Sequence, residues 1–126
     1  MNANVVDWFE IYVDDIERAR KFYQAVFGKP MMDLPTPDPT KHKMVAFAWV
    51  EGAPNAAGAL VWMPEMKAGG NSTVVYFMCE DCAVEESRVV AAGGQVMMPK
   101  FSIGEFGFCS WCIDCEGNYF GLHSIK

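Results

Sequence analysis

The sequence has no long apolar run and few basic residues. Its 126 residues contain no uninterrupted stretch of about 20 apolar residues, the length that a membrane-spanning helix needs. No basic segment followed by an apolar run marks a signal peptide near the N-terminus. Lys and Arg number 10 against 16 Asp and Glu, which gives a net charge of −6 and a pI of about 4.8. We therefore expect a cytoplasmic protein that binds neither nucleic acid nor a membrane.

The sequence also lacks an even set of cysteines, because it contains five. An odd number excludes complete internal pairing, so a reduced compartment is the simpler interpretation. The spacings Cys79-x2-Cys82 and Cys109-x2-Cys112-x2-Cys115 suggest zinc or iron–sulfur ligands as an alternative. However, an odd spacing within one strand directs two side chains to opposite faces of a sheet. We expect five free thiols, most of them in the core.

One segment occurs twice, 66 positions apart, and both copies have the pattern strand, helix, strand. Turn residues that keep a fixed offset indicate a duplicated supersecondary element. The matching pairs are Val13-Asp14-Asp15 with Cys79-Glu80-Asp81, Gly28 with Gly94, and Met31-Met32 with Met97-Met98.

Alternation and capping signals define the elements of each copy. Residues 8–13 alternate with the period of a strand. Asp14 is expected to cap the following helix, with Glu17 completing a capping box, and Gly28 to end it in the left-handed conformation. In the second copy Asp81 should cap a helix that runs through about residue 92.

Together with residues 8–13, the rest of the chain predicts four strands in each half. The fold class is α+β, with two tandem βαβββ units that form curled mixed sheets around a cavity and carry their helices outside. A single domain, 1–126, is expected, with halves at about 1–66 and 71–126. The further strands are expected near residues 31–32, 45–50, 58–63, 73–79, 95–98, 107–113 and 119–124, with loops at 32–43 and 99–106.

Two stretches resemble a known family. VDDIERARKFYQAVFG at 13–28 and DCEGNYFGL at 114–122 resemble the glyoxalase/bleomycin-resistance/dioxygenase superfamily, the vicinal oxygen chelate fold. Within it the chain looks most like the small glyoxalase-like proteins of bacteria. Cys115 stands where the ending of that family usually has proline. The resemblance implies a homodimer, because many members of the superfamily are dimers.

The resemblance also implies four metal-ligand positions, one on the first and one on the last strand of each half. They fall on Trp8, Gly58 (or its neighbour Ala59), Val74 and Gly121. None of these side chains can ligate a divalent metal. Metal-dependent glyoxalase I or dioxygenase activity is therefore not expected, and neither is a metal or another cofactor.

The strand residues on the same face as those ligand positions, which are expected to point into the cavity, are rich in aromatic side chains. Two members of the inward set could act in acid–base chemistry: Glu10, as a desolvated base between two aromatic residues, and His123. A structural ion pair is the alternative role for Glu10. The predicted ligand-binding residues are Trp8, Tyr12, Leu60, Trp62, Tyr76, Met78 and Tyr119.

Three functions fit this pattern. The first is binding of a small organic molecule in a metal-free aromatic cavity. The second is a lyase or isomerase that uses Glu10 as a base, or a metal held by unrecognised ligands. The third is a scaffold whose cavity is filled by its own aromatic residues.

Overall fold

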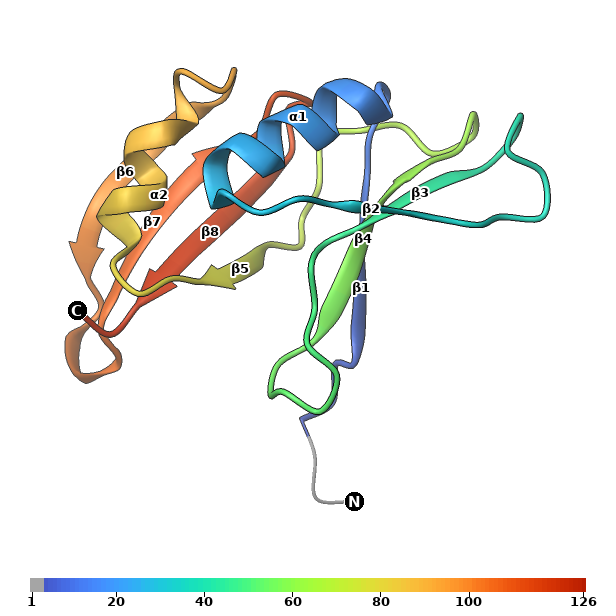
Figure 1. The fold of residues 1–126 in the computed structure, drawn as a ribbon. Helices are drawn as coiled ribbons and strands as arrows, with labels where there is room; N and C mark the ends of the chain where they lie inside the picture. Colours follow the sequence, from blue (N-terminus) through green and yellow to red (C-terminus); the bar gives the residue numbers. More distant parts are fainter. Residues whose placement is uncertain (1–3) are drawn as a thin grey trace.

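The computed structural model describes residues 4–126, so the first three residues of the predicted domain lie outside the described part. Each half forms a four-stranded mixed sheet and one α-helix, with strand orders β1-β4-β3-β2 and β5-β8-β7-β6 (Figure 1). The first half comprises β1 (Trp8–Tyr12), α1 (Ile16–Phe27), β2 (Met32–Leu34), β3 (Lys43–Ala46) and β4 (Ala57–Trp62). The second comprises β5 (Val75–Met78), α2 (Cys82–Val89), β6 (Gln95–Ser102), the 3-10 helix η1 (Gly104–Phe106), β7 (Phe108–Ile113) and β8 (Tyr119–Ser124).

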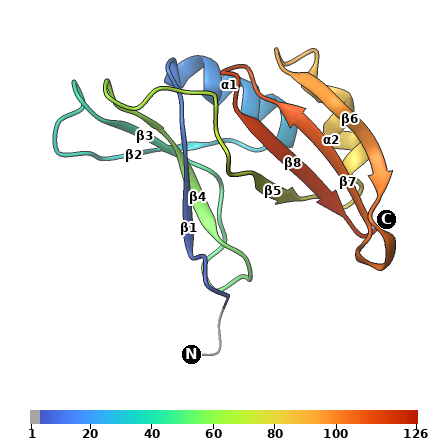
Figure 2. The ribbon, with the colours of Figure 1, turned by 180° about the vertical axis from the view of Figure 1, so that it is seen from behind.

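The predicted α+β fold of two tandem βαβββ units is confirmed. The first strand of each unit pairs in parallel with the last, and the other pairings are antiparallel. The two helices begin at Ile16 and Cys82, which preserves the 66-residue offset of the repeat. The sheets do not close: they splay apart beneath α1, and the view from behind shows the same opening (Figures 1 and 2). No described helix is long and apolar enough to cross a membrane.

The start of α1 differs from the prediction. Asp15, not Asp14, is the N-cap, and its carboxylate accepts a hydrogen bond from the Arg18 backbone N–H at 3.1 Å. Asp14 is engaged elsewhere, because its carboxylate accepts from the Ala68 backbone N–H at 3.2 Å. At the other end Gly28 adopts the predicted left-handed conformation, with φ of 68°.

Several other helix and strand boundaries also differ from the predicted ones. Asp81 caps α2 as predicted, but the helix ends at Val89 rather than near residue 92. The strand expected at 45–50 lies at Lys43–Ala46, whereas β6 extends through Pro99 into the expected loop. Proline is tolerated there because β6 is an edge strand and its register with β7 shifts on either side of Met98.

A cluster of aromatic rings forms one core between the two sheets and α1. Phe9 of β1 meets Phe77 of β5 edge-on, with ring centroids 5.9 Å apart. Tyr23 of α1 contacts rings from both halves, Phe47 at 5.3 Å and Phe120 at 5.7 Å. Each sheet therefore turns one face towards this shared core.

The cysteines of β7 also lie on two different faces of their sheet. Cys112 pairs with Phe120 and faces the core, whereas Cys109 pairs with His123 on the other face, as the odd spacing predicted. Burial raises the pKa of the Cys79 thiol to about 12 and that of Cys115 to about 11. Thiolates, the reactive form, are therefore scarce at neutral pH.

We expect the native protein to react slowly with Ellman's reagent at pH 7.5, and the urea-denatured, unreduced protein to release five equivalents of thionitrobenzoate. Burial of Cys79, Cys82, Cys109 and Cys112 is the reason for the slow native reaction. A count of three or one after denaturation, or a fast native reaction of four thiols, would contradict this expectation.

Candidate functional site

One face of the first sheet points away from the shared core. In-register partners across neighbouring strands share a face, and Glu10 pairs with Ala59 while Ile11 pairs with Leu60. Ile11 and Leu60 belong to the core, so Trp8, Glu10 and Tyr12 lie on the opposite, outer face of the sheet.

The prediction that placed Leu60 and Trp62 beside Trp8 is therefore wrong. Leu60 is fully buried in the shared core, and Trp62 packs against that core from the same face. The alternation of side chains within each strand was predicted correctly. Which residues of β4 share a face with Trp8 of β1, however, depends on the pairing register of the two strands.

Glu10 is the centre of a hydrogen-bonded group on the outer face. Its Oε2 accepts a hydrogen bond from Trp8 Nε1 at 3.1 Å, and its Oε1 accepts from the Tyr12 hydroxyl at 2.9 Å. We call these three residues the Glu10 clip. Partial burial, and then the hydrogen bond to Glu10, raise the pKa of the Tyr12 hydroxyl. Glu10 itself is exposed, so the prediction of a desolvated carboxylate is wrong.

The second sheet exposes a larger aromatic face. Tyr76 pairs with Gly121 and Met78 with His123, which places these residues and Tyr119 on one side, away from the core. Tyr76 is 49% exposed and Met78 71% exposed. The ring of Tyr76 lies against Gly121, where an added Cβ would overlap it.

Trp111 belongs to this face and was not predicted. It pairs with Gly121, is 43% exposed, and donates a hydrogen bond from Nε1 to the Tyr76 hydroxyl at 2.9 Å. The sequence did show that Trp111 and Cys109 lie two residues apart in the strand expected at 107–113, so that their side chains share a face. Which face this is depends on the pairing register of β7 with β8, which the sequence does not give.

A largely apolar groove of about 510 Å³ lies at the end of this face, where β5 and β8 finish. It contains two predicted site residues, Met78 and His123. The His123 ring nitrogen Nε2 lies 2.8 Å from the Phe106 carbonyl oxygen, which holds the imidazole at the rim of the groove. The lining residues are Met78, Cys79, Glu80, His123, Ser124, Ile125 and Lys126.

The two outer faces do not meet within one chain. Glu10 lies on the first sheet and His123 on the second, each on the face that points away from the shared core. The closed cavity that the sequence predicted between the halves is not formed by the described residues. The two acid–base candidates therefore do not pair with each other in a single chain.

The residues present do not fit a metal ion. Trp8 and Val74 offer no ligand, and the rings of Phe9 and Tyr76 cover Gly58 and Gly121. Ala59, the alternative to Gly58, carries only a methyl group. Among residues 4–126 no three His, Cys, Asp or Glu side chains are grouped so that they could hold a metal.

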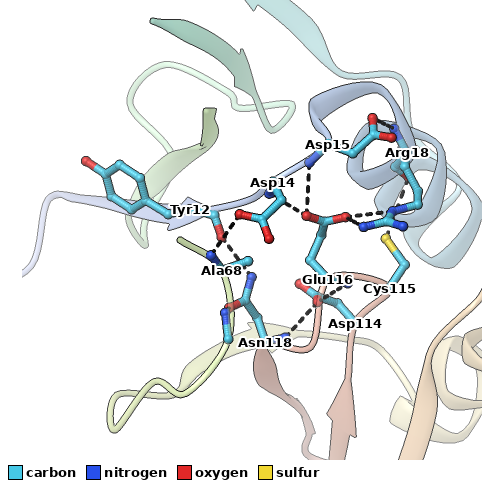
Figure 3. Close-up of polar contacts among 10 residues, drawn as sticks. Tyr12, Asp14, Asp15, Arg18, Ala68, Asp114, Cys115, Glu116 and Asn118 are labelled. Carbon is cyan, nitrogen blue, oxygen red and sulfur yellow. Dashed lines mark hydrogen bonds and ion pairs between the residues drawn. The ribbon is translucent and has the colours of Figure 1, made fainter. Parts of the chain in front are cut away.

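The turn between β7 and β8 binds the start of α1. The side chain of Glu116, which is fully buried, accepts hydrogen bonds from the backbone N–H groups of Asp14 and Asp15, the latter at 3.0 Å (Figure 3). The Arg18 guanidinium also donates to it, from Nε at 2.6 Å. This carboxylate therefore binds the N-terminal end of α1.

Asp114 and Asn118 complete this junction. Asp114 accepts hydrogen bonds from the Tyr23 hydroxyl at 2.6 Å and from the Asn118 backbone N–H at 2.9 Å. Burial raises the pKa of the Asp114 carboxyl and is the main cause of the strongly raised pKa of Tyr23. The Asn118 side chain donates to the Tyr12 carbonyl at 2.9 Å, while the Tyr12 ring points away from the junction (Figure 3). The DCEGN sequence thus connects the halves and fixes the end of β1.

Sequence comparison identifies a family model and relatives. Residues 6–37 match the model described as bleomycin resistance protein-like N-terminal. The chain is 32% identical over 118 residues to the "Putative glyoxylase CFP32" of Mycobacterium tuberculosis and of Mycobacterium bovis. That match covers 92% of this chain but only 44% of each relative, so the chain spans less than half their length.

Solved structures share the fold at low sequence identity. Glyoxalase I from Zea mays superposes with a TM-score of 0.73 at 16% identity, over 94% of this chain and 45% of that chain. A glyoxalase/bleomycin resistance protein/dioxygenase superfamily member from Sphaerobacter thermophilus gives 0.70 at 21% identity, over 98% and 99% of the two chains. These likenesses concern the fold alone.

Proposed function

Because this chain belongs to the glyoxalase/bleomycin resistance/dioxygenase superfamily, we propose that it binds a small organic molecule against the outer aromatic faces of its sheets. The observation that carries the proposal is the outer face of the second sheet. Tyr76, Met78 and Trp111 lie there, each more than two-fifths exposed, next to an apolar groove. Contiguous exposed apolar surface of this kind is typical of ligand or protein binding.

A second copy of the chain completes the proposed site. The outer face with the Glu10 clip and the outer face with His123 lie on different sheets of one chain. A twofold dimer can place the first sheet of one copy opposite the second sheet of the other, which forms two equivalent cavities. The homodimer that the resemblance implies would therefore enclose the aromatic cavity that one chain leaves open.

The proposal is for binding without a metal, in a reducing compartment such as the cytoplasm. The four ligand positions carry no donor side chain, and the five cysteines are free thiols. Turnover by Glu10 as a base is the weaker alternative, because both of its oxygens already accept a hydrogen bond. The third function, a scaffold with a filled cavity, is disfavoured because the aromatic faces are open.

Sedimentation equilibrium at micromolar concentration is expected to give twice the chain mass of 14.0 kDa. The neutral dye N-phenyl-1-naphthylamine should bind the dimer with enhanced fluorescence, because the enclosed aromatic surface is apolar. Trp111→Ala should weaken dye binding about tenfold, as loss of a buried aromatic contact costs on the order of 1–2 kcal/mol.

Trp49→Ala is the matched control. Trp49 is 49% exposed, close to the 43% of Trp111, but it lies between β3 and β4 rather than on the second sheet. Equal dye binding by the parent and Trp111→Ala, with the circular dichroism unchanged, would contradict the proposed site. A monomer that binds the dye would contradict only the requirement for a second copy.

A further inference from the structure

The Glu10 clip has the composition of a cation-binding site. A carboxylate is flanked on one strand face by an indole and a phenol, and both rings donate hydrogen bonds to it. These neutral donors hold the carboxylate in one orientation without neutralising its charge. Trp8 remains 38% exposed beside it, so part of the indole is accessible to a ligand.

Among residues 4–126, no ion pair joins a basic side chain to Glu10. The ion pairs found among residues 4–126 join Arg18 to Glu116, Arg20 to Glu17 and to Asp33, and Lys100 to Asp81. The strand residues that share the outer face of the first sheet with Glu10 are apolar or aromatic. They are Trp8, Tyr12, Met32, Leu34, Met44, Ala46, Ala57, Ala59 and Val61.

We propose that the Glu10 clip binds the ammonium group of a primary organic cation. An ionised carboxylate offers about four lone-pair positions, and the hydrogen bonds from Trp8 and Tyr12 use two of them. An ammonium group carries three N–H donors that can reach the remaining positions, and its charge compensates that of Glu10.

The flanking rings favour the same ligand class. The negative face of an aromatic ring attracts a cation, and indole is the strongest of the natural rings in this respect. Since the carboxylate is already oriented by two donors, little side-chain entropy remains to be lost on binding. The net charge of −6 also raises the local concentration of cations around the protein. The clip therefore selects a charged amine over a neutral molecule of the same shape.

This inference rests on the proposed ligand-binding function, which it extends to the first sheet. It assigns Glu10 to recognition of charge rather than to proton transfer. In the proposed dimer, the clip would lie across the cavity from the aromatic face of the second sheet and would bind the cationic end of a ligand whose apolar body contacts that face.

Benzylammonium and benzyl alcohol are the probes that test it, because they share a ring and differ in charge at neutral pH. Benzylammonium should shift the indole N–H resonance of Trp8 in a ¹⁵N–¹H spectrum in a saturable manner, and benzyl alcohol should not. Trp8→Phe assigns that resonance. Glu10→Gln keeps the size of the side chain but removes its charge, and should weaken benzylammonium binding about tenfold.

Glu105→Gln is the matched control, since it removes one exposed carboxylate from η1 in the second half and should leave binding unchanged. Tyr12→Phe keeps the charge but loses one clip donor, and should weaken binding by only about threefold. The inference is overturned if Glu10→Gln binds benzylammonium as tightly as the parent, or if benzyl alcohol shifts the Trp8 resonance equally.

The dye measurement separates this result from the proposed function. Persistence of N-phenyl-1-naphthylamine binding without a benzylammonium response would overturn the cation site and leave the aromatic site supported. Loss of both would overturn the two together.

Discussion

Glu116→Ala is expected to lower the free energy of unfolding by about 3 kcal/mol, because it leaves buried donors without a partner. The carboxylate accepts from the backbone N–H groups of Asp14 and Asp15 and from the Arg18 guanidinium. Arg18 is more than half exposed, so water can solvate it after the change. Most of the loss therefore comes from the two backbone groups at the start of α1 and from the missing negative charge at that helix end.

Urea unfolding at pH 7 measures this loss. Glu116→Gln should be intermediate, since the amide keeps one acceptor oxygen but loses the charge that the guanidinium and the helix terminus favour. Glu51→Ala is the control, because Glu51 is an exposed residue of the β3–β4 connection and should change stability by less than about 0.5 kcal/mol. A Glu116→Ala variant as stable as Glu51→Ala would show that the junction does not hold the halves together.

The elements with local signals were the ones that the sequence predicted well. Gly28 ends α1, Asp81 starts α2, and the two helices keep the offset of the repeat. Each of these features depends on residues within one turn of the helix end. The alternation of β1 and β5 was also correct, because a strand between two environments repeats every two residues.

Features that depend on contacts between residues far apart in the sequence could not be predicted in this way. The sequence favours Asp14 as the cap, because Glu17 follows it by three residues. Asp14 is instead held by contacts with Ala68 and with Glu116, 102 positions after it, and Asp15 is the cap. Leu60 and Trp62 were assigned to the wrong face because their phase relative to β1 comes from strand pairing. The contacts of Glu10 with its own neighbours are local, but its exposure depends on how far the sheets open.

The candidate site was predicted in its composition but not in its assembly. Tyr76, Met78, Tyr119 and His123 do share one face, and Trp8, Glu10 and Tyr12 share another. The sequence suggested that these faces enclose one cavity, whereas the shared aromatic core directs them apart. Local sequence patterns determine which residues share a face of a strand, but the packing of the core determines how the two sheets are oriented. Because that packing separates the two faces, the proposed function requires a second copy of the chain.

Gly107→Ala is expected to destabilise the protein by about 3 kcal/mol, through both backbone strain and a steric clash. Gly107 has φ of 105° and ψ of −129°, a region that is essentially restricted to glycine. An added Cβ would overlap the Ser124 carbonyl oxygen, and that oxygen belongs to a paired strand that cannot easily move. The same turn presents the Phe106 carbonyl to His123, so the change should also disturb the rim of the groove.

Gly104→Ala provides the comparison within the same turn. Gly104 also has a positive φ, 78°, but no atom lies within 4 Å of an added Cβ, so only the left-handed backbone is penalised, by about 1 kcal/mol. Thermal and urea unfolding of both variants measure the difference, and the chemical shifts of the His123 ring report on the groove. If the two alanine variants lose equal stability, the close approach of Gly107 to Ser124 is not a determinant of the fold. If only Gly107→Ala shifts the His123 resonances, this glycine allows the turn to hold His123 at the rim of the groove.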